Sequence, residues 1–94
     1  MFEIRTGESN AIVLTGRLDA AQASKALQTL DALDHSVVAD IAGLDYISSA
    51  GIGVLVKTHL RLQACGHAMK LANPQPRVRA VIHYAGLEQL FGLE

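Results

Sequence analysis

Two serines are followed by two glycines in DYISSAGIGVLV (residues 45–56), where a helix is expected to begin. The first N–H groups of a helix lack acceptors within it and carry the positive end of its dipole, so the position favours an anion. A phosphate of charge about −2 on Ser48 or Ser49 would therefore be tolerated by the fold and would act on a partner surface. Alternatively, one serine only caps the helix, and Gly51 and Gly53 only pack against a sheet.

The same stretch lacks the patterns of several enzyme sites. Its G-x-G has Val56 where the third glycine of a dinucleotide fingerprint would stand, and no phosphate-binding loop for a nucleoside triphosphate occurs. Ser49 lies outside a G-x-S-x-G elbow, and no histidine is placed by sequence to activate it. We therefore expect no enzymatic activity and no cofactor. We also expect no metal site, because the histidines are scattered without ligand spacing: His35, His59, His67 and His83.

The composition describes a small, aliphatic, nearly neutral chain. Its 94 residues suffice for one hydrophobic core, so a single domain over residues 1–94 is expected. Eight basic and nine acidic residues give a formal charge of −1, which offers no attraction to nucleic acid or to an anionic membrane. The lone Cys65, the lack of a signal-peptide layout and the lack of a long apolar run together predict a cytoplasmic location.

Periods of two and of about 3.6 residues alternate along the chain and predict alternating strands and helices. Apolar runs at Met1–Arg5 and Ala11–Leu14 predict a hairpin, and Asp19 stands as the N-cap of a helix that ends near Leu33. Four further elements are expected: a buried strand at Val37–Ile41, a helix from about Ser49 to Ala64, a strand at His67–Ala72, and a helix introduced by Pro74 and Pro76 and capped by Gly86.

The resulting order, ββαβαβα, is typical of an α/β domain whose helices pack on a mixed sheet of four strands, or five. Binding sites in such folds gather beyond the carboxyl ends of strands, where the chain turns into a helix. Two turns of this kind carry polar residues, at Gly16–Asp19 and at Asp45–Gly51. If the strands before them are neighbours, both turns lie at the same end of the sheet.

Over its whole length the sequence resembles the STAS domains of the anti-sigma-factor-antagonist family. The segment VLTGRLDA (13–20) is similar to the family's G-x-L-D turn. The segment VVADIAGLDYISSAGIGVL (37–55) is similar to its strand followed by L-x-x-[IM]-D-S-[ST]-G-[LI]-G, and PRVRAVIHYAGLEQLF (76–91) is similar to its last helix and A-G-L ending. The resemblance implies a STAS-like α/β fold.

The resemblance also implies a phosphorylation switch. In this family the unmodified antagonist binds an anti-sigma factor that is itself a serine kinase, which releases a sigma factor, and phosphorylation ends the interaction. A serine phosphatase is the further implied partner. The motif places the acceptor at Ser49, with Ser48 as the alternative. The implied partner-binding residues are Asp19, Ser48, Ser49, Gly51, Ile52, Gly53, Val54 and Lys57.

The sequence departs from the family pattern at Ser48, which stands where the family has an acidic residue. A second function therefore stays open, that of a STAS scaffold or cytoplasmic subunit in a transport or signalling assembly, without phosphorylation. Lys57 and Arg61, expected on the outer side of the second helix, form either a solvated face or a dock for an acidic partner. His59 is expected to be a half-buried structural residue.

Overall fold

The computed structural model describes residues 1–7 and 10–93. It contains the predicted order of strands and helices. The helix expected from Ser49 to Ala64 has those bounds, and Asp19 is the N-cap of the first helix, as predicted. The elements are β1 (Phe2–Thr6), β2 (Ala11–Leu18), α1 (Ala20–Leu30), β3 (Val37–Ile47), α2 (Ser49–Ala64), β4 (Met69–Ala72) and α3 (Pro76–Tyr84).

The strands form a mixed four-stranded sheet in the order β1-β2-β3-β4. β1 and β2 pair antiparallel, whereas β2 with β3 and β3 with β4 pair in parallel. The mixed α/β sheet predicted from the sequence is therefore confirmed. Because β2 and β3 are parallel neighbours, the turns that follow them lie at the same end of the sheet.

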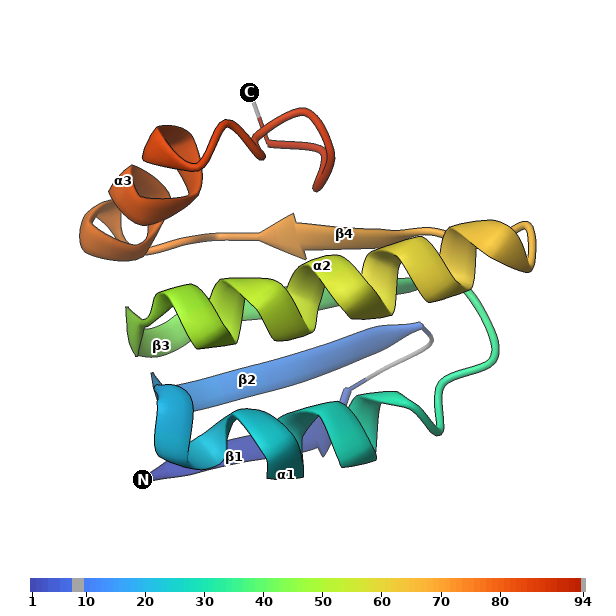
Figure 1. Cartoon of the computed structure of the whole chain (residues 1–94), viewed down its shortest axis with the longest axis horizontal. Coiled ribbons are helices and arrows are strands. Elements are labelled where there is room, and N and C mark those ends of the chain that lie inside the picture. Colours follow the sequence, from blue (N-terminus) through green and yellow to red (C-terminus); the bar gives the residue numbers. More distant parts are fainter. Residues whose placement is uncertain (8–9, 94) are drawn as a thin grey trace.

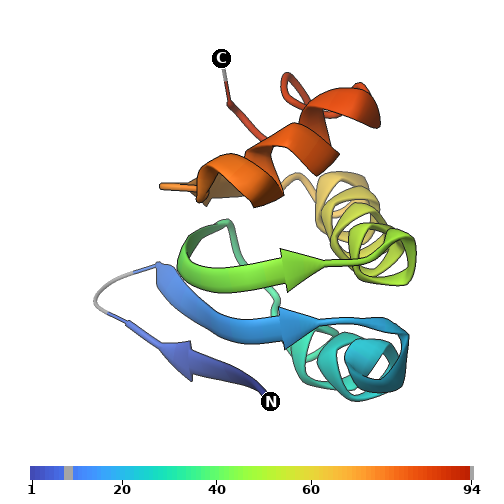
Figure 2. The same cartoon turned by 90° about the vertical axis from the view of Figure 1, so that its left-hand side faces the viewer.

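Two helices cover one side of this sheet. Figure 2 shows α1 and α2 side by side on the same side of the strands, while α3 lies at the β4 end, and Figure 1 shows the same arrangement from the helix side. The core lies between these layers and is almost wholly aliphatic, with Phe91 as its one large aromatic side chain. Leu14, Ile41, Leu55 and Ile82 are fully buried in it.

The second and third strands are longer than predicted. β2 runs to Leu18 and β3 to Ile47, because the two strands stay paired as far as that residue pair, with shifts in register on the way. Gly16, which resembles a turn residue in the sequence, has φ +92° within β2. A Cβ at this position would collide with the carbonyl oxygen of Met1. The glycine thus allows β1 and β2 to approach closely, a non-local requirement.

Two other boundaries differ slightly from the prediction. α1 ends at Leu30 instead of near Leu33, where the N–H of Asp31 closes the helix by donating to Leu27 O at 2.8 Å. β4 begins at Met69 instead of His67, because the N–H of His67 donates to Leu62 O at 2.8 Å and belongs to the end of α2.

Candidate functional site

The candidate site is built on the backbone that joins the ends of β2 and β3. The carbonyl oxygen of Leu18 accepts from the backbone N–H of Ser48 at 3.0 Å. It also lies 3.4 Å from the Ser48 hydroxyl, which donates a weaker hydrogen bond to it. The last residue of β2 therefore fixes where α2 begins, and the turn after β2 lies against the turn after β3.

The two serines of the motif have different environments. Ser48 is the N-cap of α2, with extended backbone, and its half-buried Oγ accepts from the N–H of Gly51 at 3.1 Å. Ser49 is the first residue of the helix and is exposed. Within the described part of the chain the Ser49 hydroxyl has no hydrogen-bond partner. Ser48 thus has a structural role, and Ser49 is the serine that a modifying enzyme can reach.

The two glycines differ in the same way. A Cβ on Gly51 would come within 2.5 Å of Leu18 O and 2.9 Å of Ile47 Cγ1, so this position needs glycine for α2 to lie against the sheet. A Cβ on Gly53 would meet nothing within 4 Å. The packing alternative therefore accounts for Gly51 but leaves Gly53 without a structural reason.

Gly53 lies in a groove between α1 and α2. The groove has a volume of about 350 Å³ and begins one residue after Ser49 along α2. Its walls are mostly small or aliphatic side chains: Ala23, Ser24 and Leu27 from α1, and Ala50, Gly53, Val54 and Lys57 from α2. The open space beside Gly53 is therefore continuous with the exposed start of α2.

The predicted partner-binding residues divide into two groups. Gly51, Ile52 and Val54 are buried, with Ile52 9% and Val54 5% exposed, because α2 packs against both the sheet and α1. Ser49 and Lys57 are exposed, and the remaining three, Asp19, Ser48 and Gly53, are half-buried. The surface around the start of α2 is thus formed mainly by the second group.

Asp19 and Arg61, two charged residues considered in the sequence analysis, make hydrogen bonds within the domain. Asp19 Oδ1 accepts from the N–H of Gln22 at 3.2 Å and so caps α1. Arg61 is half-buried and donates from Nη2 to Leu30 O at 3.0 Å, with its Nε 3.5 Å from Asp31 Oδ1. Arg61 therefore closes the end of α1, whereas Lys57 is the basic residue of α2 that faces solvent.

A third turn lies at the same end of the sheet and was missed from the sequence. Gln75, which precedes α3, donates from Nε2 to Ala42 O at 2.7 Å and to Asp45 Oδ1 at 3.3 Å. In addition, the Arg17 guanidinium lies 4.4 Å from the centre of the Tyr46 ring on the neighbouring strand. Neither pair has a local signal, because each depends on the register of parallel strands.

Over the described residues, no histidine side chain hydrogen-bonds to Ser49. His59 is more buried than predicted, at 5% exposed, with Nδ1 3.3 Å from the donating N–H of Met69 and its ring packed edge-on against Phe91. The hydrogen bond and positive charge of His35 lower the pKa of the Asp34 carboxyl, and this pair precedes β3.

Over residues 1–7 and 10–93, no group of His, Cys, Asp and Glu could hold a metal ion. No helix in the same range is long and apolar enough to cross a membrane.

The family described as "Mlab, STAS domain" matches residues 1–93. The chain therefore belongs to the STAS domain family, a family of binding modules, which confirms the resemblance seen in the sequence. No curated protein sequence matches it significantly.

Solved structures of anti-sigma factor antagonists share the fold. The unphosphorylated form of SpoIIAA superposes with a TM-score of 0.78 and 21% identity, over 96% of this chain and 84% of that protein. A putative antagonist from Thermotoga maritima gives 0.77 at 17% identity, over 95% and 81% of the two chains. A sulfate transporter family protein from Wolinella succinogenes gives 0.74 at 13% identity, over 96% and 76%. At these identities the similarity shows the fold.

Proposed function

We propose that this protein is an anti-sigma factor antagonist of the cytoplasm, switched by phosphorylation of Ser49. In this proposal the unmodified domain binds an anti-sigma factor that is a serine kinase, and a sigma factor is released. The kinase transfers a phosphate to the Ser49 hydroxyl, which ends the interaction, and a serine phosphatase restores the binding form.

The environment of Ser49 carries the proposal. Its hydroxyl is exposed at the first position of α2, where the free N–H groups and the helix dipole favour a phosphate. Ser48 already caps the helix through Gly51 N–H at 3.1 Å, so the cap does not depend on Ser49. A phosphate on Ser49 would thus leave the fold intact and change the surface that a partner meets.

The groove beside Ser49 supports a partner at the same place. A partner that covers the start of α2 would contact Ser49, Gly53 and Lys57, and would lie over the space that Gly53 leaves open. The buried Gly51, Ile52 and Val54 would act indirectly, by setting the position of the helix. Asp19 would flank the contact from the neighbouring turn.

Phosphate transfer provides the direct test. The protein is incubated with ATP and each serine-kinase anti-sigma factor of its own organism, and its intact mass is measured. We expect the wild type, Ser48→Ala and the control Ser24→Ala to gain one phosphate, and Ser49→Ala to gain none. Absence of a phosphate with every such kinase, or its retention in Ser49→Ala, contradicts the proposal.

A second candidate function is a STAS scaffold or subunit of a transport or signalling assembly that works without phosphorylation. It is favoured by Ser48, which gives α2 a hydroxyl cap where the antagonist pattern has an acid. The same fold also occurs in the sulfate transporter family protein and in the murine anion transporter Slc26a9, the latter with a TM-score of 0.70 and 19% identity over 89% of this chain and 15% of that protein. In this case Ser49→Ala would bind its partner as the wild type does, and protein purified from cells would carry no phosphate.

A further inference from the structure

The two edge strands of the sheet differ in whether another segment hydrogen-bonds to their outer side. On β4, the outward N–H of Leu71 donates to Phe91 O at 3.0 Å, so the C-terminal segment covers this edge. On β1, none of the described residues hydrogen-bonds to the outer side of the strand. Figure 2 likewise shows β1 as the last strand, with no segment beyond it. The free edge of β1 is able to pair with another strand.

The pairing of β1 with β2 defines which backbone groups are free. Arg17 N–H donates to Met1 O at 2.8 Å, and Gly7 N–H donates to Ala11 O at 2.8 Å, so the odd-numbered residues of β1 hydrogen-bond to β2. Hydrogen-bonded and non-hydrogen-bonded positions alternate along an antiparallel pair. The N–H and C=O groups of the even-numbered residues Phe2, Ile4 and Thr6 therefore point outward.

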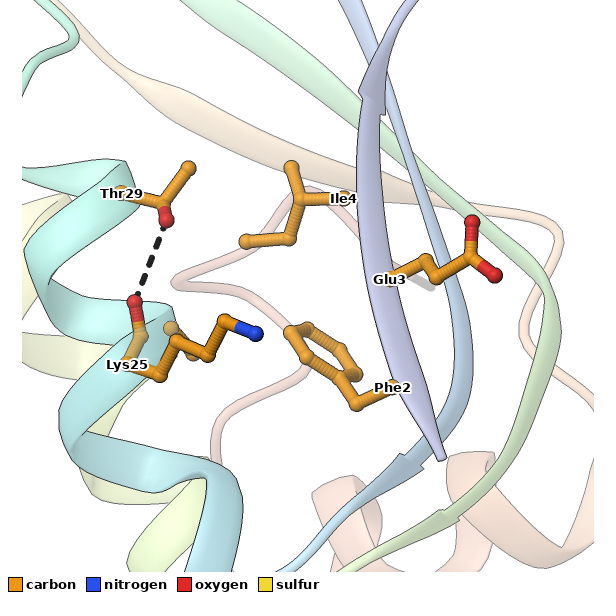
Figure 3. A pocket seen from close by; sticks show the side chains of 6 residues that line it. Phe2, Glu3, Ile4, Lys25 and Thr29 are labelled. Carbon is orange, nitrogen blue, oxygen red and sulfur yellow. Dashed lines mark hydrogen bonds between the residues drawn. The ribbon is translucent and has the colours of Figure 1, made fainter.

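The side chains of β1 alternate between two faces. Phe2 and Ile4 are half-buried and point toward α1, where they line a groove of about 230 Å³ with Lys25 and Thr29 (Figure 3). Glu3 points to the other side of the sheet in the same view, and both Glu3 and Arg5 are exposed. One face of the strand is therefore apolar, and the other carries two opposite charges that are two residues apart in the sequence.

We propose that β1 pairs antiparallel with β1 of a second copy of this chain, which makes a symmetric dimer with a continuous sheet. The two-fold axis passes between Ile4 and Ile4 of the partner subunit. The outward groups of Ile4 then hydrogen-bond to each other across the axis, and Phe2 exchanges hydrogen bonds with Thr6 of the partner subunit. On the exposed face, Glu3 lies opposite Arg5 of the partner subunit, and Arg5 lies opposite the partner's Glu3.

The charges select this register among the possible ones. Only registers that place even-numbered residues opposite even-numbered ones satisfy the outward groups, because the odd-numbered ones already bond to β2. A shift in one direction would place Glu3 opposite the partner's Glu3, and a shift in the other would place Arg5 opposite the partner's Arg5. Like charges directly opposite each other destabilise a strand pair, whereas opposite charges stabilise it.

This dimer is independent of the proposed function. β2 lies between β1 and β3, the strand that leads into Ser49, so both copies keep the start of α2 free. Phosphate transfer to Ser49 and pairing through β1 can therefore fail or succeed separately.

Charge exchange tests the interface. By sedimentation equilibrium, we expect the wild type to approach twice the monomer mass of 10.0 kDa as concentration rises. Glu3→Arg and Arg5→Glu alone should each weaken dimerisation by at least about tenfold, because each places like charges opposite each other. The double variant Glu3→Arg/Arg5→Glu should dimerise like the wild type. An equimolar mixture of the two single variants should form the heterodimer, in which opposite charges again face each other.

Two control variants distinguish a loss of strand pairing from an effect of net charge or of misfolding. Arg77→Glu changes the net charge by the same amount as Arg5→Glu on the exposed first turn of α3, and it should leave dimerisation unchanged. Thr6→Pro removes an outward N–H at an exposed edge position, so it should be folded by circular dichroism and monomeric by sedimentation equilibrium.

The register is tested directly by NMR on a mixture of labelled and unlabelled protein. Close Hα–Hα contacts occur at non-hydrogen-bonded positions of an antiparallel pair, so we expect an intermolecular contact between Glu3 and Arg5 of the partner subunit. A wild type that stays monomeric, or charge variants that all dimerise alike, overturns the proposal. An intermolecular contact between Glu3 and the partner's Glu3 overturns the register.

Discussion

The carbonyl oxygen of Leu18 and the backbone N–H of Ser48 are hydrogen-bonded at 3.0 Å, across 30 residues of sequence. This bond joins the last residue of β2 to the N-cap of α2. Because Ser48 also receives the N–H of Gly51 on its hydroxyl, the start of α2 is anchored both to the sheet and to its own first turn. Ser49 is therefore presented on a rigid support, and changes beside it should have separable effects on stability and on binding.

Alanine at the two glycines of α2 should change stability in opposite directions. Gly51→Ala should destabilise the protein by about 1–3 kcal/mol, because its Cβ would lie 2.5 Å from the Leu18 carbonyl oxygen, which belongs to the sheet. Gly53→Ala should stabilise it by about 0.5–1 kcal/mol, because its Cβ meets open space and alanine favours a helix. Urea unfolding of both variants is the measurement. Equal effects would mean that α2 does not pack against Leu18 as described.

Alanine substitution at the two serines should have different effects on the free energy of unfolding, as well as on phosphorylation. Ser48→Ala should lower the free energy of unfolding by about 1 kcal/mol, because it removes the acceptor of the Gly51 N–H. Ser49→Ala should change it by less than about 0.5 kcal/mol, because its exposed hydroxyl makes no bond within the described residues. Ser48→Asp keeps a capping acceptor and should stay close to the wild type. Thermal unfolding of the three variants distinguishes these outcomes, and a larger loss in Ser49→Ala would reverse the assignment of the cap.

Arg61 and Lys57 are two basic residues of α2 whose alanine variants can be compared. Arg61→Ala should cost about 1–2 kcal/mol, because the guanidinium holds the carbonyl oxygen of Leu30 at 3.0 Å and lies beside Asp31. Lys57→Ala should cost less than about 0.5 kcal/mol, since Lys57 is exposed, but it should weaken partner binding if the start of α2 is the contact. Unfolding and binding measured together on both variants test this separation.

Local sequence signals predicted those helices whose ends are marked by residues close by in the sequence. The period of α2, the cap at Asp19 and the prolines at the start of α3 all led to elements that the structure contains. The ends of β2 and β3 were wrong because they depend on how the strands pair with each other. Gly16 resembles a turn residue when read alone, and only the approach of Met1 explains it as part of a strand.

The candidate site shows the same division between local and non-local information. The exposed Ser49 follows from the helix start, which the sequence predicts. The burial of Val54 does not, because it depends on the packing of α1 against α2. The Gln75 side chain joins the same end of the sheet only because β4 is parallel to β3. The identity of the acceptor serine, however, remains a prediction of the motif and of its exposure.

If Ser49 is the switch, it should act at the interface and not by refolding the domain. A phosphate at the start of α2 meets free N–H groups and a favourable dipole, and no acidic residue occupies the first turn of that helix. A partner seated over Gly53 would instead face an added charge of about −2 at Ser49.

We therefore expect phosphorylation to lower partner affinity by about a hundredfold or more, while the backbone stays nearly unchanged. Ser49→Asp should lower it less, because a carboxylate carries less charge and reaches less far than a phosphate. Calorimetry gives the affinities, and amide chemical shifts of the free domain, with and without the phosphate, report its conformation. Shift changes confined to residues 16–20 and 45–58 agree with an interface effect. Changes spread through β4 and α3 would indicate a conformational switch and contradict it.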